Sequence, residues 1–234
     1  MVATAELQIT WEPLPDDYDL PDDPVDNINQ PALAAALTDS LQVAGRLSET
    51  TLTPSNYGIC ATVNGKLVIK APDWAFVPNI RVPRSDIARS YTPQLQGDIP
   101  VIVVEFLSDT DGKEYSSKPT YPPGKWFFYE QVLKVPNYAI FNPETGNLEL
   151  YRLDAAGNYQ LQPANDAERH WIEEMGLSLG VWEGTRESRS GFWLRWWNEE
   201  DNLLLWSIEL AQRERDRAER LAAQLRAAGI EPEV

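Results

Sequence analysis

Apolar residues along the chain recur with the spacing of helices in some segments and of strands in others. Leucines at every fourth position after Pro31 predict a first helix, which ends in the segment 46–49. Apolar residues at helical spacing predict a second helix over 125–135. Short alternating or β-branched runs predict strands at 58–63, 66–69, 74–77, 101–107, 138–141, 148–153 and 159–162. This order of elements predicts an α/β (α+β) core with a central mixed β-sheet flanked by helices.

The last part of the chain predicts one further helix, over 203–228. Its apolar residues are spaced three and four apart, as in a coiled coil or in a helix that docks on another surface. Packing of this helix on its own domain is the alternative, and the sequence alone leaves both open. The preceding segment 171–197 holds five of the nine tryptophans. We interpret these as core or as an oligomer interface rather than as a platform for stacking bases.

The composition divides the chain into three parts. Residues 1–30 are rich in Pro and Asp and contain eight acidic residues but no Lys or Arg, which predicts a loosely ordered acidic arm. Residues 31–198 form the predicted domain with its Trp-rich extension, and residues 199–234 form the C-terminal helix. The chain has 234 residues, 43% of them hydrophobic, which is enough for one domain of ordinary size.

The formal net charge of −16 argues against extensive contact with nucleic acid. Proteins that bind DNA usually present a basic surface, because neutralising phosphates supplies much of the affinity. DNA is therefore a candidate partner without support from the net charge, although a local basic patch is still compatible with the sequence. No apolar run approaches the ~20 residues that span a bilayer. A single cysteine, Cys60, excludes an intrachain disulfide, and no secretory signal is recognisable, so we expect a cytoplasmic protein without membrane association.

Three polar residues in apolar surroundings are the strongest candidates for chemistry: Asp73, Glu105 and Lys125. Glu105 follows four β-branched residues, so it lies at the end of a strand that we expect to be buried. A buried carboxylate has to be neutralised, paired or bound to a metal ion. Asp73 and Glu105 could supply oxygen ligands to Mg²⁺, and Lys125 could orient a water molecule or stabilise developing charge. The alternative is a purely structural ion pair between Glu105 and Lys125.

Four other residues are weaker candidates. Ser108 follows the buried strand and either bonds the backbone of the next turn or contacts a ligand. Tyr129 lies one helical turn after Lys125 and either packs in the core or orients the lysine or a phosphate. Glu49 is a candidate for an additional acidic ligand. His170, the only histidine, is expected to lie on the surface without a catalytic role.

The order of several short motifs resembles a known family. Ala71-Pro72-Asp73-Trp74 is followed by Val103-Val104-Glu105-Phe106-Leu107-Ser108, then by Lys125 and Tyr129, and then by the segments 135–143 and 148–153. Together these motifs resemble the Uma-type family of restriction-endonuclease-like proteins, which belongs to the PD-(D/E)xK nuclease superfamily. The resemblance is close over about residues 45–165. It extends through the Trp-rich segment and the C-terminal helix, as in a longer subgroup of the family.

The resemblance implies a restriction-endonuclease-like core in which Asp73 and Glu105 are the acidic metal ligands, with Mg²⁺ or Mn²⁺ as the cofactor. The usual superfamily lysine lies two positions after the acidic residue, where this chain has Leu107. The Uma-type family takes its basic residue from the following helix, and this residue corresponds to Lys125. The expected function is that of a Mg-dependent endonuclease that hydrolyses DNA phosphodiester bonds. The alternative is an inactive nuclease fold that acts as an interaction or assembly module. We expect a homodimer, because the last helix has an apolar stripe and because similar nucleases form dimers.

Overall fold

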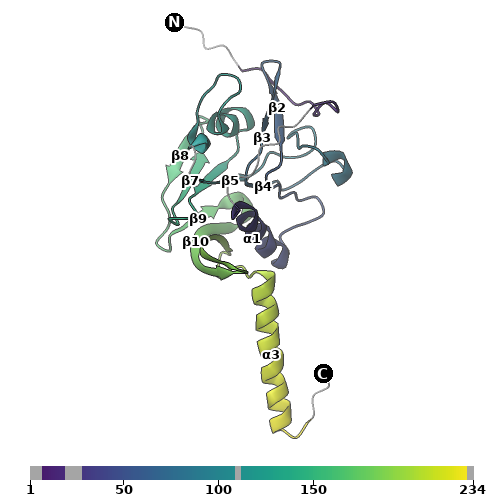
Figure 1. Cartoon of the computed structure of the whole chain (residues 1–234), viewed down its shortest axis with the longest axis vertical. Helices are drawn as coiled ribbons and strands as arrows, with labels where there is room; N and C mark the ends of the chain where they lie inside the picture. The colour runs from purple at the N-terminus through teal and green to yellow at the C-terminus, as the bar shows by residue number, and fades with distance from the viewer. Residues whose placement is uncertain (1–6, 19–27, 109–111, 231–234) are drawn as a thin grey trace.

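The centre of the protein is a five-stranded mixed sheet (Figure 1). The structure is a computed structural model that describes residues 7–18, 28–108 and 112–230. The sheet has the order β4-β5-β6-β7-β8, in which β5 and β6 are parallel and the other pairs are antiparallel. Its strands are β4 (Trp74–Phe76), β5 (Ile102–Phe106), β6 (Asn137–Phe141), β7 (Leu148–Leu153) and β8 (Tyr159–Gln162). The predicted mixed sheet is therefore confirmed, and β7 and β8 have the predicted bounds.

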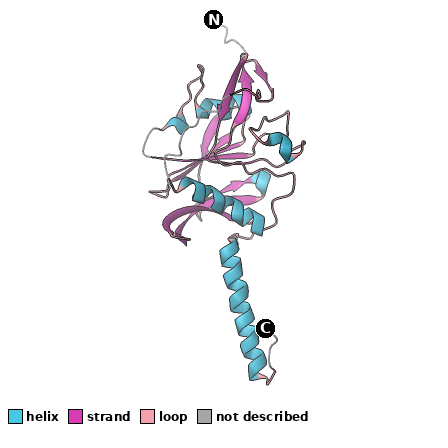
Figure 2. Cartoon of the chain, turned by 45° about the vertical axis from the view of Figure 1, so that its right-hand side comes forward, coloured by secondary structure: helices cyan, strands magenta, loops and turns pink. Residues whose placement is uncertain are grey.

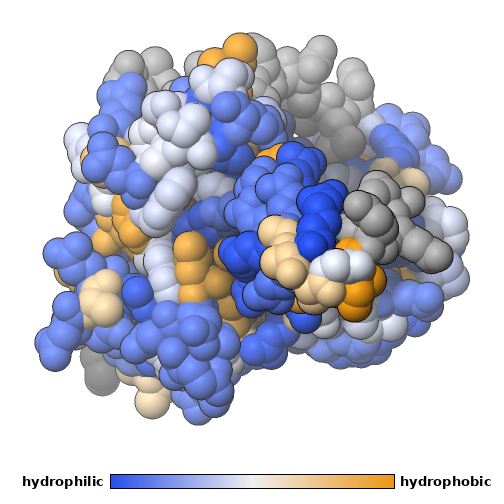
Figure 3. Space-filling view, turned by 90° about the horizontal axis from the view of Figure 1, so that it is seen from below, coloured by the Kyte–Doolittle hydropathy of each residue, from blue (hydrophilic) through white to orange (hydrophobic). Residues whose placement is uncertain are grey.

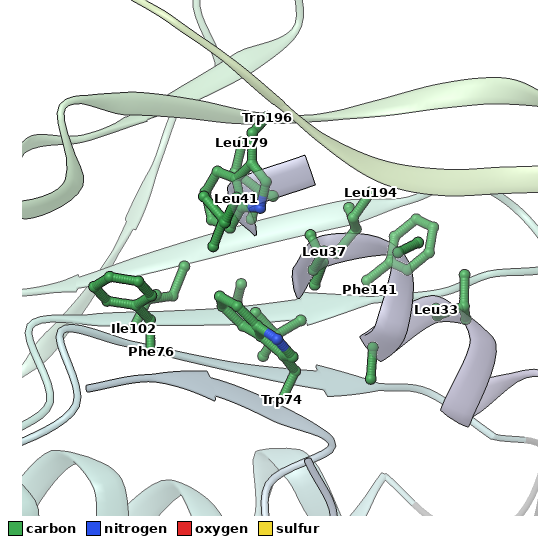
Figure 4. Packing of buried hydrophobic residues seen from close by; sticks show 14 of the residues in the cluster. Leu33, Leu37, Leu41, Trp74, Phe76, Ile102, Phe141, Leu179, Leu194 and Trp196 are labelled. Atoms are coloured by element: carbon green, nitrogen blue, oxygen red, sulfur yellow. The ribbon is translucent and has the colours of Figure 1, made fainter. Parts of the chain in front are cut away.

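One face of this sheet is covered by helix α1 (Gln30–Val43) and by a second sheet of order β11-β10-β9. The strands of this second sheet are β9 (Arg169–Ile172), β10 (Leu177–Arg186) and β11 (Arg189–Trp197). Figure 4 shows how Leu37 and Leu41 of α1 meet Trp74 of the central sheet and Trp196 of β11 in one apolar layer. The first helix is thus confirmed, and it buries its leucine stripe between two sheets.

The opposite face is covered by a small sheet of order β1-β2-β3 and by a helical segment that contains α2 and η3 (Figure 2). The elements on this side are β1 (Ile9–Thr10), β2 (Ile59–Val63), β3 (Lys66–Lys70), α2 (Lys125–Phe127) and η3 (Phe128–Leu133). Short 3₁₀ turns lie at η1 (Arg84–Ile87), η2 (Lys113–Tyr115) and η4 (Glu173–Met175). The predicted hairpin of β2 and β3 is confirmed, with Asn64 and Gly65 both at positive φ in its turn.

Strand β5 contributes to both apolar layers because successive side chains point to opposite faces. Ile102, Val104 and Phe106 belong to the layer beneath α1, whereas Val103 belongs to the layer beneath η3. Glu105 therefore faces the helical segment, and it is the polar residue of β5, fully buried. This alternation determines which elements can reach the carboxylate.

The Trp-rich segment folds as a hairpin of two long strands, β10 and β11. The sequence predicts no strands here, because the segment is rich in aromatic residues and glycine. Trp193 and Trp196 are almost fully buried, and Trp197 is 7% exposed. Most of these tryptophans therefore belong to the core. The interpretation of the cluster as core is confirmed for these three residues.

The C-terminal helix α3 (Ser207–Ala227) projects away from the body of the protein (Figures 1 and 2). It begins at Ser207 rather than at 203, because Trp206 is buried in the core and its backbone is extended. Its first turn is held by Arg195, whose guanidinium donates two hydrogen bonds to Glu209 at 2.7 and 3.1 Å and lies 3.5 Å from the Trp206 ring centroid. No side chain of α3 is buried. Seen from the α3 end, the surface is mostly hydrophilic, with apolar residues in small separate areas (Figure 3).

Part of the predicted acidic arm contacts the body of the protein. Ile9 and Thr10 form β1 beside β2, Leu14 is 9% exposed, and the Arg89 guanidinium donates to the backbone carbonyls of Pro15, Asp16 and Tyr18. The remaining arm residues, 1–6 and 19–27, lie outside the described residues. The acidic arm thus contributes a short strand, β1, to the small sheet and buries Leu14. Within 7–18, 28–108 and 112–230, none of the helices has both the length and the apolar character needed to cross a membrane.

Candidate active site

Asp73 and Glu105 lie side by side at the ends of neighbouring strands. Trp74 of β4 pairs with Val104 of β5 in an antiparallel register, so the residue before β4 and the residue after Val104 are opposite each other. Asp73 Oδ2 accepts a hydrogen bond of 2.6 Å from the backbone N–H of Phe106, which fixes the aspartate at the strand end. The register of two strands therefore brings together carboxylates that are 32 positions apart in the sequence.

The Glu105 carboxylate is fully buried, and both of its oxygens accept hydrogen bonds. Lys125 Nζ donates to Oε2 at 2.7 Å, and the Tyr129 hydroxyl donates to Oε1 at 3.0 Å. The Glu105 side chain has no exposed surface, whereas 24% of the Lys125 side chain is exposed. The carboxylate is thus fixed in one orientation by two donors from the helical segment.

Burial favours the protonated forms of the two acids, and the charge of Asp73 adds to this effect at Glu105. Burial raises the pKa of Glu105 to about 8, and although Lys125 opposes this shift, the nearby Asp73 adds to it. Burial also raises the pKa of Asp73, against the opposing effects of Lys125 and of the Phe106 N–H. Burial lowers the pKa of Lys125, but Glu105 and Asp73 outweigh it, so the net pKa is raised. Two carboxylates of raised pKa next to each other are an arrangement that a divalent cation would relieve.

Tyr129 lies in an unusual helical turn. The α2 turn continues as the π-helical turn η3, and the segment ends at Lys134, which has a left-handed backbone. π-Helical turns are rare and occur mostly as single turns, frequently at functional sites. Lys125 and Tyr129 are four positions apart and meet the same carboxylate, as expected for residues on one helix face. The sequence predicted this helix but not its wide turn.

A cavity of about 590 Å³ opens beside the carboxylates, and lysines are its main charged lining. Asp73 and Lys125 line it together with Ser108 and Glu114. The chain has six lysines, and four of them line this cavity: Lys70, Lys113, Lys118 and Lys125. Positive charge is therefore concentrated here on a protein whose net charge is strongly negative. The composition gave no sign of this patch, because lysines that are far apart in the sequence become neighbours only in the fold.

The other candidates from the sequence lie in different places. Ser108 lines the cavity, and Tyr129 contacts Glu105. Glu49 is exposed on a turn after α1, where its backbone carbonyl accepts from Arg84 Nε at 3.4 Å, and it does not line the cavity. His170 is 6% exposed rather than on the surface, so that expectation is wrong: its place on β9 beside β10 covers it.

One cavity residue went unnoticed in the sequence. Gln30, the first residue of α1, lines the cavity and donates from Nε2 to the carbonyl oxygen of Phe106 at 3.3 Å. Nothing in the local pattern marked it, because its neighbours predict only the start of a helix. It lies here because α1 packs across the sheet with its N-terminus at the ends of β4 and β5.

The residues present are compatible with a magnesium or manganese ion. Mg²⁺ is commonly held by one or two carboxylates together with several waters, and it prefers oxygen ligands. Asp73 provides a carboxylate that lines the cavity, and Glu105 provides a second one, buried directly behind it. No cluster of three or more His, Cys, Asp or Glu residues suited to a metal occurs among the described residues. An ion bound here would therefore have Asp73 and Glu105 as its acidic ligands among the described residues, with water completing its coordination.

The mixed sheet with flanking helices, and the acidic pair where β4 begins and β5 ends, place the protein in the restriction-endonuclease-like class. The chain belongs to the Uma2 family, described as "Putative restriction endonuclease", whose sequence profile matches residues 31–187. The resemblance noted in the sequence is thereby confirmed. No curated protein matches the chain.

Proposed function

We propose that the protein is a metal-dependent endonuclease of the PD-(D/E)xK type, with Asp73, Glu105 and Lys125 as its catalytic residues and DNA as its substrate. The observation that carries the proposal is the convergence of these three side chains, from two strands and one helix, beside a lysine-lined cavity. Proteins of the restriction-endonuclease-like class generally use divalent metal ions. The family assignment supports a nuclease-like function.

Each residue has a role that follows from its position. Asp73 and Glu105 would hold Mg²⁺ or Mn²⁺, which when bound lowers the pKa of a coordinated water and offsets charge on the scissile phosphate. Tyr129 keeps the Glu105 carboxylate in a fixed orientation through the 3.0 Å hydrogen bond. Lys125 extends from Glu105 to the cavity, so its ammonium can contact a phosphate oxygen as negative charge develops. The absence of a lysine at 107 is compensated in this proposal by Lys125.

A cleavage assay with matched variants tests this proposal. The purified protein should cut DNA in the presence of Mg²⁺ or Mn²⁺, and Asp73→Asn and Glu105→Gln should abolish both cleavage and metal binding measured by calorimetry. Glu49→Gln is the control, since this acidic residue is exposed and outside the cavity, and it should leave both unchanged. If the wild-type protein binds neither metal, the proposal is wrong.

A non-catalytic assembly role is the second candidate. It is favoured by α3, whose side chains are not buried and which projects from the body. It also agrees with the hydrogen bonds that both Glu105 oxygens already accept from protein donors. In this case the ion pair is structural, and Glu105→Gln would change stability without any change in metal binding.

A further inference from the structure

Among the described residues, two lysines of the cavity form no ion pair with an acidic side chain. Lys70 is the last residue of β3, and Lys118 lies in the segment that leads to α2. Within the described part of the chain, neither ammonium makes an ion pair or a hydrogen bond to a side chain. Lys125 differs from both, because Glu105 is its partner.

The ammonium groups of these lysines are close enough to repel one another. Burial, and then the neighbouring charges of Lys125 and Lys118, lowers the pKa of Lys70. Lysine stems are flexible and would separate in water unless the fold held them together. The fold places them around one cavity, so a bound anion would relieve a repulsion that the protein alone leaves in place.

The cationic surface continues along β3 beyond the cavity. Lys66 lies four positions before Lys70 and therefore on the same side of the strand. Its ammonium lies 5.0 Å from the centroid of the Tyr121 ring, and the Tyr121 hydroxyl donates to the carbonyl of Leu67 at 3.1 Å. The Tyr121 residue is 52% exposed, and the next residue, Pro122, lines the cavity. A ring fixed at the cavity rim and open to solvent offers a face on which a base can stack.

We propose that Lys70 and Lys118 hold a backbone phosphate next to the scissile one, and that Tyr121 stacks a base of the same strand, so that the substrate enters as an unpaired nucleic-acid strand. This inference rests on the proposed nuclease function and names its substrate class. Lysines that follow the backbone together with an exposed aromatic ring are the combination by which proteins bind single strands. A paired base is already stacked within its duplex and cannot use the Tyr121 face without being extruded.

The phosphate contacts can be tested by binding without cleavage. Fluorescence anisotropy with a labelled single-stranded oligonucleotide, in EDTA and over a range of salt concentrations, measures affinity and its salt dependence. Each phosphate contact contributes about 0.7 to the slope of log K against log salt for a single strand. The double variant Lys70→Gln/Lys118→Gln removes both contacts to this phosphate and should lower the slope by about this amount. Lys134→Gln removes an exposed lysine outside the cavity and should leave the slope unchanged.

The stacking contact needs a second pair of variants. Tyr121→Ala should weaken single-strand binding by about five- to a hundredfold, whereas Tyr121→Phe retains the ring and should bind as the wild type does. A hairpin duplex with the same label should bind both variants equally. If Tyr121→Ala weakens duplex and single-strand binding alike, the assignment of an unpaired strand is wrong.

Failure of the subsite and failure of the nuclease proposal give different results. An unchanged salt slope in the double variant Lys70→Gln/Lys118→Gln, with the variant folded by circular dichroism, overturns the phosphate subsite whether or not the protein cuts DNA. A wild-type protein that binds the strand with the expected slopes but does not cut it with Mg²⁺ or Mn²⁺ contradicts only the nuclease function and supports the subsite.

Discussion

Lys125 and Glu105 form an ion pair of 2.7 Å in which the carboxylate has no exposed surface and the ammonium reaches the cavity. Burial of a charge is costly, and one cation does not fully offset it here, since the pKa of Glu105 is still raised to about 8. The folded protein therefore binds a proton at Glu105 more tightly than the unfolded chain, where the pKa is close to 4.5.

This difference predicts how Glu105 changes stability with pH in the absence of metal. Its contribution is fully present below about pH 4.5 and is lost as the pH rises to about 8, at ~1.4 kcal/mol per pKa unit for an ideal isolated group. Glu105→Gln removes this loss, so the variant should gain stability relative to the wild type between pH 5 and pH 9. Urea unfolding across this range measures the effect. Parallel curves for the two proteins would contradict the pKa shift.

The ion pair of Arg195 and Glu209 predicts a large loss of stability on substitution. Arg195 has no exposed surface, and its Nη2 also donates to the carbonyl of Leu204 at 2.9 Å. Glu209→Gln leaves a buried cation without its counter-charge and should lower the free energy of unfolding by about 3 kcal/mol. Glu214→Gln is the control, because its pair with Arg217 is exposed and 3.8 Å long, and it should cost less than about 0.5 kcal/mol. Equal losses in both variants would show that Arg195 does not depend on Glu209.

We also propose that the outer turns of α3 mediate a homodimer. Leu221 and Leu225 are 50% and 38% exposed and lie on one helix face. A chain that ends at Asp216 retains Trp206 and Glu209 but loses this face, so it should be monomeric by light scattering with an unchanged melting temperature. The full chain should be a dimer. A monomeric full chain would refute the proposal.

Cys60 offers a probe of the folded core. Its side chain is fully buried in β2, and burial raises the pKa of the thiol, which a hydrogen bond with Ser90 only partly opposes. Because the thiolate is the reactive form, native protein at pH 8 should not react with a disulfide reagent, whereas protein in ~6 M guanidinium should react at once. Fast reaction of the native protein would mean that β2 opens readily.

The sequence predicted most of the helices and strands, but not how they pack against one another. The strands around Trp74 and Glu105 and the leucine stripe of α1 follow from periodicity, because each of these segments packs a regular face against the core. The sheet of β9, β10 and β11 was not predicted, since glycines and tryptophans obscure the alternation of its strands. The start of α3 is predicted at 203 but lies at Ser207. Trp206 has the spacing of an apolar helix residue, but its backbone is extended and its side chain packs in the core.

The candidate site shows the same limit. The apolar strand before Glu105 marked this residue, since a carboxylate at such a position needs a partner. No sequence pattern distinguishes Lys70, Lys118 or Gln30 from other polar residues, because only the tertiary fold brings them to the cavity. A wide turn such as η3 also leaves no recognisable pattern in the sequence.

The separation of Glu105 and Lys125 onto different elements has an evolutionary consequence. Of the described residues between them, Ser108 and several in 113–124 supply much of the cavity wall, while the strand and the helix at the two ends hold Glu105 and Lys125. Insertions or exchanges in this segment can therefore alter what the cavity accepts without moving either group. On the proposed function, a change in this one connection would change the strand that the cavity accepts while the acid and the lysine keep their places.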